Sequence, residues 1–588
     1  MKEKKVSKNT IFQSFFYLNK IFNKYQKKTA IVLLIIMIFG MFFEILLLNN
    51  LMILLNYLTE ANVKPPLLAV FFNNLLKIDN PKTLVLFLFI VTFFLKTIIN
   101  VIVRWKEGKF IYELKAQISE LLYIGYIKLP FIFHQRTNSS KILKNITYEI
   151  EQFSMFIGAI TKFVLESLVM IGISIYLLRV NYQVSLICIF AFLVFGYCFN
   201  YLNKKKIKIM SVNRLFHQDE KMKSIIEGLS GMKEYKFYSK EQSVINNFIL
   251  HNNSIAKIST SMVLRGVMTK PAFELFMLII LSIFLFYFIS YDLLSASIIP
   301  ILGIYMAAAY RLIPSIALIV QSAQEIQFNL AAVKNLYKDI KKFKQDNREN
   351  FNSKTEIKFN KKIEIKNLTF SYDSQDIKNK KNILENLNVE IKKGDFIGIY
   401  GESGSGKSTF IDILIGLHTP NTGAILVDEG NIQSNVKNWQ NLIGCVPQEV
   451  FILDDTLKKN IAFGLSEEKI SDKDIERALE FSNLLKFSTS LENGVNTIIG
   501  ERGSRLSGGQ KQRIGIARAI YNNPEILIFD ESTNSLDVET ENNIIEEINL
   551  LKKNKTLIIV SHNKEIFKKC DYVFKISEKK IKKISNIN

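Results

Sequence analysis

Six long apolar runs constrain the fold of this chain more than any other feature of its sequence. They cover approximately residues 30–56, 83–104, 154–178, 183–203, 267–290 and 296–322. The hydrocarbon core of a bilayer is about 30 Å thick, so a helix needs about 20 mostly apolar residues to cross it. A helix also satisfies its own backbone hydrogen bonds where no water is present. The sequence therefore predicts an α-helical transmembrane domain with six spans.

Basic residues predict how the spans are oriented. Lys and Arg number 76 against 54 Asp and Glu, a net charge of +22. Residues 1–29 hold eight lysines against Glu3 alone and lack a signal-peptide cleavage motif, so we expect a retained cytoplasmic arm. The connections 105–153 and 204–266 are rich in Lys and Arg and are expected inside, as the positive-inside rule requires. Orientation thus accounts for much of the charge, and we expect no nucleic-acid partner.

The inner connections keep helical apolar spacing, as at Ile111, Leu114 and Ile118. The spans are therefore predicted to continue as helices beyond the membrane; two small soluble domains are the alternative. Further on, a polar stretch is predicted to be a linker, and β-rich runs that alternate with helices predict an α/β domain. The expected order is arm, transmembrane domain, linker and α/β domain, over residues 1–29, 30–327, 328–358 and 359–588.

A glycine-rich loop follows the predicted strand Phe396–Tyr400 and precedes an apolar helix. This is the context of a phosphate-binding loop, whose glycines let backbone N–H groups turn toward the phosphates. Lys407 is expected to contact the β- and γ-phosphates of ATP, and Ser408 to bind Mg²⁺. The expected nucleotide-binding residues of this loop are Gly401, Ser403, Gly404, Ser405, Gly406, Lys407, Ser408 and Thr409.

A second apolar run, Ile526–Phe529, ends in the acidic pair Asp530 and Glu531. At the end of a strand, Asp530 is expected to hold Mg²⁺ through its water shell. Glu531 is expected to polarise the water that attacks the γ-phosphate. Together the two motifs predict an ATPase that uses ATP and Mg²⁺.

A third motif, Leu506–Arg513, stands between the other two and precedes a helical segment. Its sequence, LSGGQKQR, resembles the signature of ATP-binding cassette (ABC) proteins. If the motif stood alone, a glycine-rich turn at the start of a helix would be the favoured interpretation. The resemblance implies that the signature contacts nucleotide through Ser507, Gly508, Gly509 and Gln510.

Four further residues match the ABC pattern in chain order. The resemblance assigns Tyr372 to adenine stacking and His562 to the γ-phosphate. It assigns Gln448 to Mg²⁺ sensing and catalysis, and Asp537 to the loop that crosses between two cassettes. In this family the phosphate loop of one cassette is completed by the signature of another, and the chain has one cassette. The resemblance therefore implies a homodimer with two equivalent ATP sites; a heterodimer is the alternative.

The N-terminal half resembles exporters of this family, in which the membrane domain is fused to the cassette. Lys128–Phe131 and Glu227–Gly231 look like the first and second inner loops of such exporters. The fold class implied is a six-span ABC exporter domain followed by an α/β ABC ATPase domain.

Charged residues inside the apolar runs are the clue to the substrate. Lys96 and Arg311 lie deep in the second and sixth runs, where each would be costly facing lipid, and Lys270 lies near the start of the fifth. We predict that these three cations line a water-filled cavity and bind an anionic phosphate or pyrophosphate head group. One alternative is that Lys96 and Arg311 pair with carboxylates inside the bundle, namely Glu44, Glu166 or Glu274. A second is that Lys270 only extends toward the membrane interface.

A narrower resemblance concerns Lys141–Ile146, Asn181–Tyr182 and Tyr310–Ser315. These segments look like the bacterial lipid-linked oligosaccharide flippase of the N-glycosylation pathway. It implies ATP-driven flipping of a polyprenyl-pyrophosphate-linked oligosaccharide from the inner to the outer leaflet of the bacterial inner membrane, with the cassette in the cytoplasm. The outer segment Leu58–Pro81 would then form a short helix that receives the polyprenyl tail, or simply a packed loop helix.

Other functions remain open at this point. Export of another lipid or of a peptide on the same scaffold is the alternative to glycan flipping. A soluble ABC ATPase of DNA repair or the ribosome would suit the positive charge. The six predicted spans argue against that soluble class.

Overall fold

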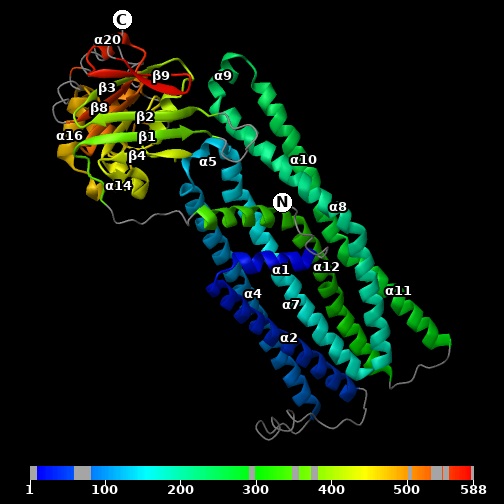
Figure 1. Ribbon diagram of the computed structural model, residues 1–588. Helices are drawn as coiled ribbons and strands as arrows, with labels where there is room; N and C mark the ends of the chain where they lie inside the picture. The colour runs from blue at the N-terminus through cyan, green and yellow to red at the C-terminus, as the bar shows by residue number, and fades with distance from the viewer. Residues whose placement is uncertain are drawn as a thin grey trace. The chain divides into compact units, whose positions relative to one another are not determined.

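The computed structural model describes residues 10–58, 81–290, 298–346, 356–372, 382–500, 506–531 and 555–584, with Gly503 and Glu546. The chain forms two compact units. The first unit comprises Met1–Leu129 and Thr137–Arg348, and the second comprises Pro130–Arg136 and Glu349–Asn588. Figure 1 shows the long helices of the first unit and the sheets of the second.

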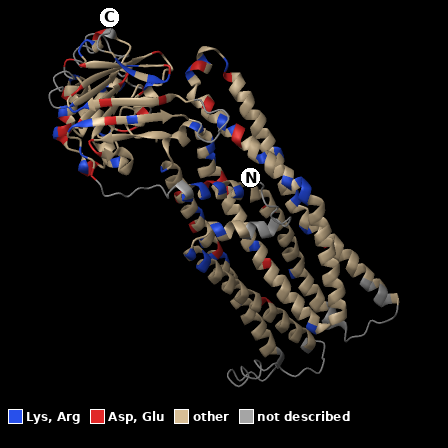
Figure 2. Cartoon of the chain, in the orientation of Figure 1, with Lys and Arg blue, Asp and Glu red and all other residues tan. Residues whose placement is uncertain are grey.

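The first unit is helical throughout its described secondary structure. Within the described ranges, six helical stretches are long and apolar enough to cross a membrane, which confirms the predicted number of spans. Figure 2 shows that charged side chains are sparse along one part of these helices and more frequent along the rest. The helices are α1 (Thr10–Ile21), α2 (Lys24–Leu58), α4 (Pro81–Ile127), α6 (Ser139–Lys144), the π-helix η1 (Asn145–Glu149), α7 (Ile150–Val180), α8 (Tyr182–Ser230), α9 (Met232–Phe237), α10 (Glu241–Val267), α11 (Thr269–Ser290) and α12 (Ile298–Asp346).

The long helices continue well past their apolar runs, as the helical spacing of the inner connections predicts. Helices α8 and α12 each have 49 residues, which at 1.5 Å per residue is about twice the thickness of a hydrocarbon core. Helix α7 packs along α12, and α2 packs along α4. Buried Ile173 and Ala308 lie at the contact of α7 with α12, and Leu48 of α2 belongs to the same cluster.

The start of the predicted linker differs from the structure. Residues 328–346 are helical and form the end of α12, whereas the sequence assigns them to a linker. Phe328, Val333 and Leu336 are buried there, so the polar residues between them cover one face of a packed helix.

In the part of the second unit that the structure describes, the strands form two β-sheets. One is largely antiparallel, in the order β2-β1-β4-β5, and the other has the order β10-β9-β3-β8-β7-β6. The predicted strands around residues 363–365, 396–400, 526–529 and 556–560 are confirmed as β1, β3, β7 and β8. The strands are β1 (Lys362–Phe370), β2 (Leu384–Lys392), β3 (Phe396–Gly401), β4 (Thr422–Val427), β5 (Gly430–Asn431), β6 (Ile443–Val446), β7 (Ile526–Asp530), β8 (Thr556–Val560), β9 (Tyr572–Ser577) and β10 (Lys580–Ile584).

Parallel pairing in the larger sheet brings three loops to one edge. Strands β3, β8 and β7 run parallel, with Ile397 opposite Ile558 and Asp530 opposite Val560. Their carboxyl ends therefore meet at the same edge of the sheet, where ligands bind in open α/β folds. The main helices of this unit are α13 (Lys407–Leu414), α14 (Val436–Asn441), α15 (Leu457–Ile461), α16 (Asp472–Phe481), α17 (Leu485–Ser490), α18 (Gly508–Tyr521) and α20 (Lys564–Phe567).

A short helix from early in the chain belongs to the second unit. Helix α5 (Phe131–Arg136) interrupts the sequence of the first unit, and its Ile132 packs against the buried core of the second. The sequence assigns these residues to an uninterrupted domain over 30–327. The sequence alone does not show that α5 belongs to the second unit, because the residues that Ile132 packs against lie more than 200 positions further along the chain.

Candidate functional site

The phosphate loop lies between β3 and α13, as predicted. Gly404 has φ +79° and Gly406 has φ +102°, a left-handed conformation that side chains with a Cβ rarely adopt. A Cβ on Gly406 would also lie 3.0 Å from a methyl group of Leu384. Glycine is thus required both for the backbone conformation and for the close packing of this loop.

Lys407 is fixed inside this loop. Its side chain is 6% exposed, and Nζ donates hydrogen bonds to the carbonyl oxygens of Gly401 at 2.9 Å and Glu402 at 3.2 Å. Nζ also lies 3.7 Å from a carboxylate oxygen of Glu531. The ammonium group is therefore held at the mouth of the loop, where an anionic phosphate would take the place of the carboxylate.

Glu531 is the centre of the candidate catalytic cluster. It follows β7 with φ +48°, a strained conformation for a residue other than glycine. Its carboxylate accepts a hydrogen bond from Gln448 Nε2 at 3.0 Å and lies 3.1 Å from His562 Nε2. The structure thus brings together the three predicted catalytic residues, together with Lys407.

Asp530 and Ser408 form the candidate magnesium site. Burial, and then the neighbouring Glu531 carboxylate, raise the pKa of Asp530, while a hydrogen bond from Ser408 opposes that shift. Its Oδ1 atom is buried and has no hydrogen-bond partner. A carboxylate oxygen and a hydroxyl are ligands that suit Mg²⁺, which also keeps several waters, so these residues fit the ion.

The candidate adenine-stacking residue, Tyr372, is anchored beside the loop. Its hydroxyl lies 3.0 Å from the hydroxyl of Thr409, and its ring meets the ring of His418 edge-on. His418 was not predicted from the sequence. Its buried ring also packs against Phe370 and against Phe131 of α5, with ring centres 5.2 and 5.7 Å away. This ring connects the tyrosine to α5 within the second unit.

The signature residues form the start of α18. Ser507 and Gln510 make a capping box, in which the serine hydroxyl accepts from the backbone N–H of Gln510 and the Gln510 side chain accepts from that of Ser507. Gly508 and Gly509 occupy the first turn, where they leave the helix N-terminus uncovered by side chains. Contact with nucleotide stays a prediction for all four residues. Asp537 lies outside the described residues.

Asp412 of α13 allows a test of the electrostatics around this site. Burial, and then the nearby Asp530, raise the pKa of Asp412 to about 6. Because this value lies above the ordinary one, the charged carboxylate costs stability above pH 6, and the cost disappears as the pH falls. Asp412→Asn should therefore stabilise the nucleotide-free second unit by about 1–3 kcal/mol near pH 8 and by about half as much near pH 5. Thermal unfolding at both pH values measures the difference; an equal gain at both would contradict it.

The cations predicted to bind substrate are all paired in the structure. Lys96 Nζ lies 2.8 Å from Glu44, and Arg311 contacts Glu44 at 3.0 Å and Glu166 at 3.5 Å. Lys270 lies elsewhere, 60% exposed and 3.6 Å from Glu274 one turn along its helix. This is the arrangement of the pairing alternative. Lys96 and Arg311 share a carboxylate, whereas Lys270 is not brought to them; their role toward substrate stays a prediction.

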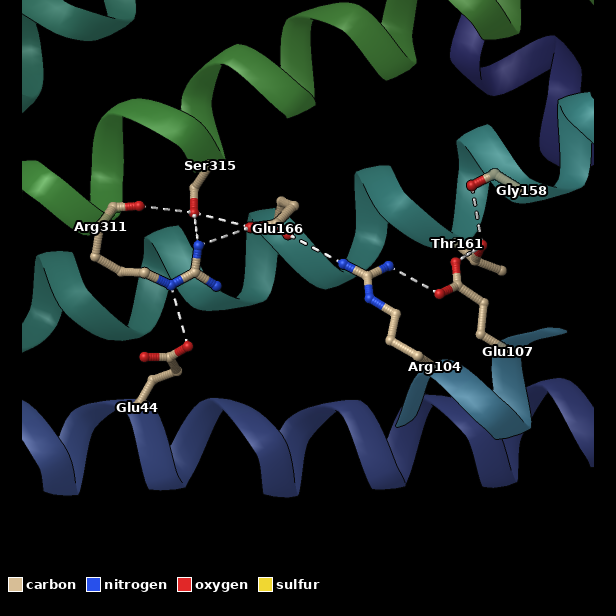
Figure 3. A network of polar contacts seen from close by, with 8 residues as sticks. All are labelled: Glu44, Arg104, Glu107, Gly158, Thr161, Glu166, Arg311 and Ser315. Carbon is tan, nitrogen blue, oxygen red and sulfur yellow. Dashed lines mark hydrogen bonds and ion pairs between the residues drawn. The ribbon is translucent and has the colours of Figure 1, made fainter. Parts of the chain in front are cut away.

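The charged network extends to residues that the sequence analysis did not single out (Figure 3). Arg104 contacts Glu107 at 2.9 Å and Glu166 at 3.7 Å, and the hydroxyl of Thr161 donates to Glu107 at 2.5 Å. A polar cavity of about 140 Å³ lies in this network, lined by Gly40, Glu44, Asn100, Val103, Arg104, Leu165, Glu166, Val169 and Arg311. Arg104 is the last residue of the apolar run 83–104 and stands two residues before Lys106, so sequence position alone associates it with the end of that run.

Comparison with known proteins places these features in a family context. Residues 384–534 match the family model described as ABC transporter. The chain is 28% identical over 484 residues to the ATP-dependent lipid A-core flippase of Escherichia coli (strain K12), covering 81% of this chain and 80% of that protein. It is 26% identical over 477 residues to the flippase of the same name from Vibrio vulnificus (strain YJ016), covering 81% and 79%.

The fold is also found among solved structures. A bacterial Atm1-family ABC exporter with ATP bound superposes with a TM-score of 0.73 at 19% identity, covering 95% of this chain and 96% of that one. The chain therefore has the ABC exporter fold, with six apolar helices followed by an α/β ABC domain. The family match and the relatives support an ATP-hydrolysing transporter, which confirms the predicted enzyme class.

Proposed function

We propose that the protein uses ATP hydrolysis to move an anionic lipid from the inner to the outer leaflet of a bacterial inner membrane. The observation that carries this proposal is that one chain has six helical stretches able to cross a membrane and a cluster that joins Lys407, Gln448 and His562 to Glu531. Relatives named as lipid flippases match over four fifths of its length. The proposal places the N-terminus and the second unit in the cytoplasm, on the side of the basic connections.

The residues around Glu531 would have separate roles in binding and hydrolysing ATP. Lys407 and the backbone of its loop would bind the phosphates, and Tyr372 would stack on the base. Glu531 would take the proton from the attacking water, oriented by Gln448 and His562, which already contact it. Mg²⁺, when held by Ser408 and Asp530, would neutralise part of the phosphate charge.

The partner in this proposal is a second copy of the chain. The signature at the start of α18 presents uncovered backbone N–H groups, which suit a phosphate. A chain with one phosphate loop and one signature would complete two equivalent sites by pairing with itself. ATP binding would close the paired ATPase domains, and hydrolysis would release them.

Export of a lipid other than a polyprenyl-linked glycan is better supported than glycan flipping. The relatives are named for lipid A-core, and none of the names reported above refers to a polyprenyl carrier. Lys96 and Arg311 in the membrane unit are the groups that would attract a phosphate-bearing head group. The glycan-linked pyrophosphate lipid remains the narrower hypothesis, and peptide export has no observation in its favour.

Reconstitution into proteoliposomes tests the proposal. We expect ATP-dependent translocation of a fluorescent anionic phospholipid, and a loss of at least about tenfold in Lys96→Ala and Arg311→Ala, since each removes a charge-assisted contact worth about 1.5–3 kcal/mol. Lys270→Ala is the comparison variant, because its cation is exposed and separate. Translocation at the parent rate in both Lys96→Ala and Arg311→Ala would contradict the substrate proposal.

A further inference from the structure

The charges of the membrane unit form a balanced set rather than a free cationic surface. Lys96, Arg104 and Arg311 face Glu44, Glu107 and Glu166, so the network is neutral when all six groups are charged (Figure 3 draws all but Lys96). Four helices contribute, namely α2, α4, α7 and α12. Neutrality explains how this many ionisable groups are tolerated among apolar helices.

Within this set the carboxylates are more deeply placed than the cations. The side chains of Glu44 and Glu166 are 5% and 3% exposed, against 17% for Lys96 and 29% for Arg311. A deeply buried carboxylate needs a cation, whereas a partly exposed cation keeps a side open to another anion. Glu44 is the branch point, because one of its oxygens contacts Lys96 and the other contacts Arg311.

The position of Arg311 is fixed independently of Glu44. Its Nη1 donates to the hydroxyl of Ser315 at 2.9 Å, and that hydroxyl lies 2.8 Å from Glu166. Removing the charge of Glu44 would therefore leave the guanidinium in place and still paired on its other side. The adjoining cavity of about 140 Å³, which Glu44 and Arg311 line, far exceeds the roughly 10–15 Å³ that one water needs, so a polar group has room beside Arg311.

We propose that Glu44 is an internal counter-ion that occupies Lys96 and Arg311 until a phosphate-bearing head group displaces it, and that it thereby sets the affinity for anionic lipid. The proposal rests on the proposed function, in which these cations meet the head group. A doubly charged phosphate monoester is the class of head group best able to compete with a carboxylate for two cations. A neutral or zwitterionic head group has no net charge to offer in exchange.

Glu44→Gln tests this directly, since glutamine keeps the size of the side chain and removes its charge. The readout is the lipid concentration that half-maximally stimulates ATP hydrolysis by the full-length protein in detergent, with phosphatidic acid as anionic probe and phosphatidylcholine as neutral probe. We expect the half-maximal concentration of phosphatidic acid to fall by about tenfold, equivalent to about 1.4 kcal/mol. The response to phosphatidylcholine should not change.

Two further variants distinguish the effect of removing the Glu44 charge from a general disturbance of the structure. Glu274→Gln is the control, because Glu274 is a carboxylate of the same unit that pairs with Lys270 outside this network. It should leave the half-maximal concentration unchanged. The double variant Glu44→Gln with Lys96→Met restores neutrality and should return the value toward that of the parent. Should Glu44→Gln fail to fold, Glu166→Gln frees Arg311 on its other side and is expected to lower the same concentration.

The outcomes distinguish this inference from the function on which it rests. A parent protein that responds equally to both probes would overturn the proposed anionic substrate. A parent that prefers phosphatidic acid, combined with an unchanged value in Glu44→Gln, would overturn the counter-ion role and leave the function standing. If Glu44→Gln raises the basal hydrolysis rate without any shift in lipid concentration, the network is a conformational lock, and the inference is equally wrong.

Discussion

Glu531→Gln should lower the ATP turnover rate by about 100-fold or more, because it removes the group that would accept the proton of the attacking water. Glutamine keeps the shape of the side chain and can still accept a hydrogen bond from Gln448, whose amide nitrogen lies 3.0 Å from Glu531. ATP binding should therefore survive. Steady-state hydrolysis and equilibrium binding of a fluorescent ATP analogue give the two values.

A matched variant is available at the opposite end of the same strand. Glu525 directly precedes β7 and pairs with Lys393 at 2.6 Å, whereas Glu531 directly follows β7. Glu525→Gln should hydrolyse ATP at close to the parent rate. Undiminished turnover in Glu531→Gln would remove this residue from its assigned role.

Lys407→Ala should abolish ATP binding at concentrations that saturate the parent. The ammonium group is the buried cation of the phosphate loop, and loss of one charged hydrogen bond costs about 1.5–3 kcal/mol, or about 10- to 150-fold in affinity. A further loss is expected because Nζ also fixes the carbonyl groups of Gly401 and Glu402. Titration with the same fluorescent analogue gives the dissociation constant.

Lys393→Ala is the control for this second experiment. Lys393 also donates to a backbone carbonyl, that of Phe359 at 2.6 Å, and also pairs with a glutamate, but it lies away from the phosphate loop. Its replacement should leave ATP affinity within about twofold of the parent. Equal losses in the two variants would mean that Lys407 acts through general stability rather than through phosphate binding.

Local patterns predicted the parts of the fold that depend on neighbours in sequence. The apolar runs gave six spans, since crossing a bilayer requires a continuous length of about 20 residues. The glycine-rich loop and the acidic pair were placed correctly at strand ends, and parallel pairing then brought Lys407 and Glu531 to one edge of the sheet. The strained backbone of Glu531 carries no such pattern, because its φ of +48° is imposed by surrounding contacts.

Features that depend on distant partners could not be predicted. The end of α12 reads as a polar linker because only part of its surface is covered, by apolar residues such as Val333. Helix α5 belongs to the second unit through Ile132 and Phe131, whose partners are remote in sequence. His418 has no motif around it, so its contact with Tyr372 emerges only from the fold.

The charged network shows the same limit most clearly. The depth of Lys96 and Arg311 follows from counting residues along a helix, but whether they face a cavity or a carboxylate depends on the rotation of each helix about its axis. The structure pairs both with Glu44 and adds Arg104 to the set. Pairing and substrate binding are compatible if the carboxylate is displaceable, which is why Glu44 is the informative residue.

Coupling of ATP hydrolysis to lipid movement is the central claim, and one measurement addresses it most directly. Proteoliposomes containing the parent or Glu531→Gln would be supplied with ATP and Mg²⁺, and the rate at which a fluorescent anionic phospholipid changes leaflet would be followed by quenching from outside. We predict rapid translocation by the parent with ATP and none above background by the variant. Equal rates in the two preparations, or no movement by a parent that hydrolyses ATP, would contradict the account.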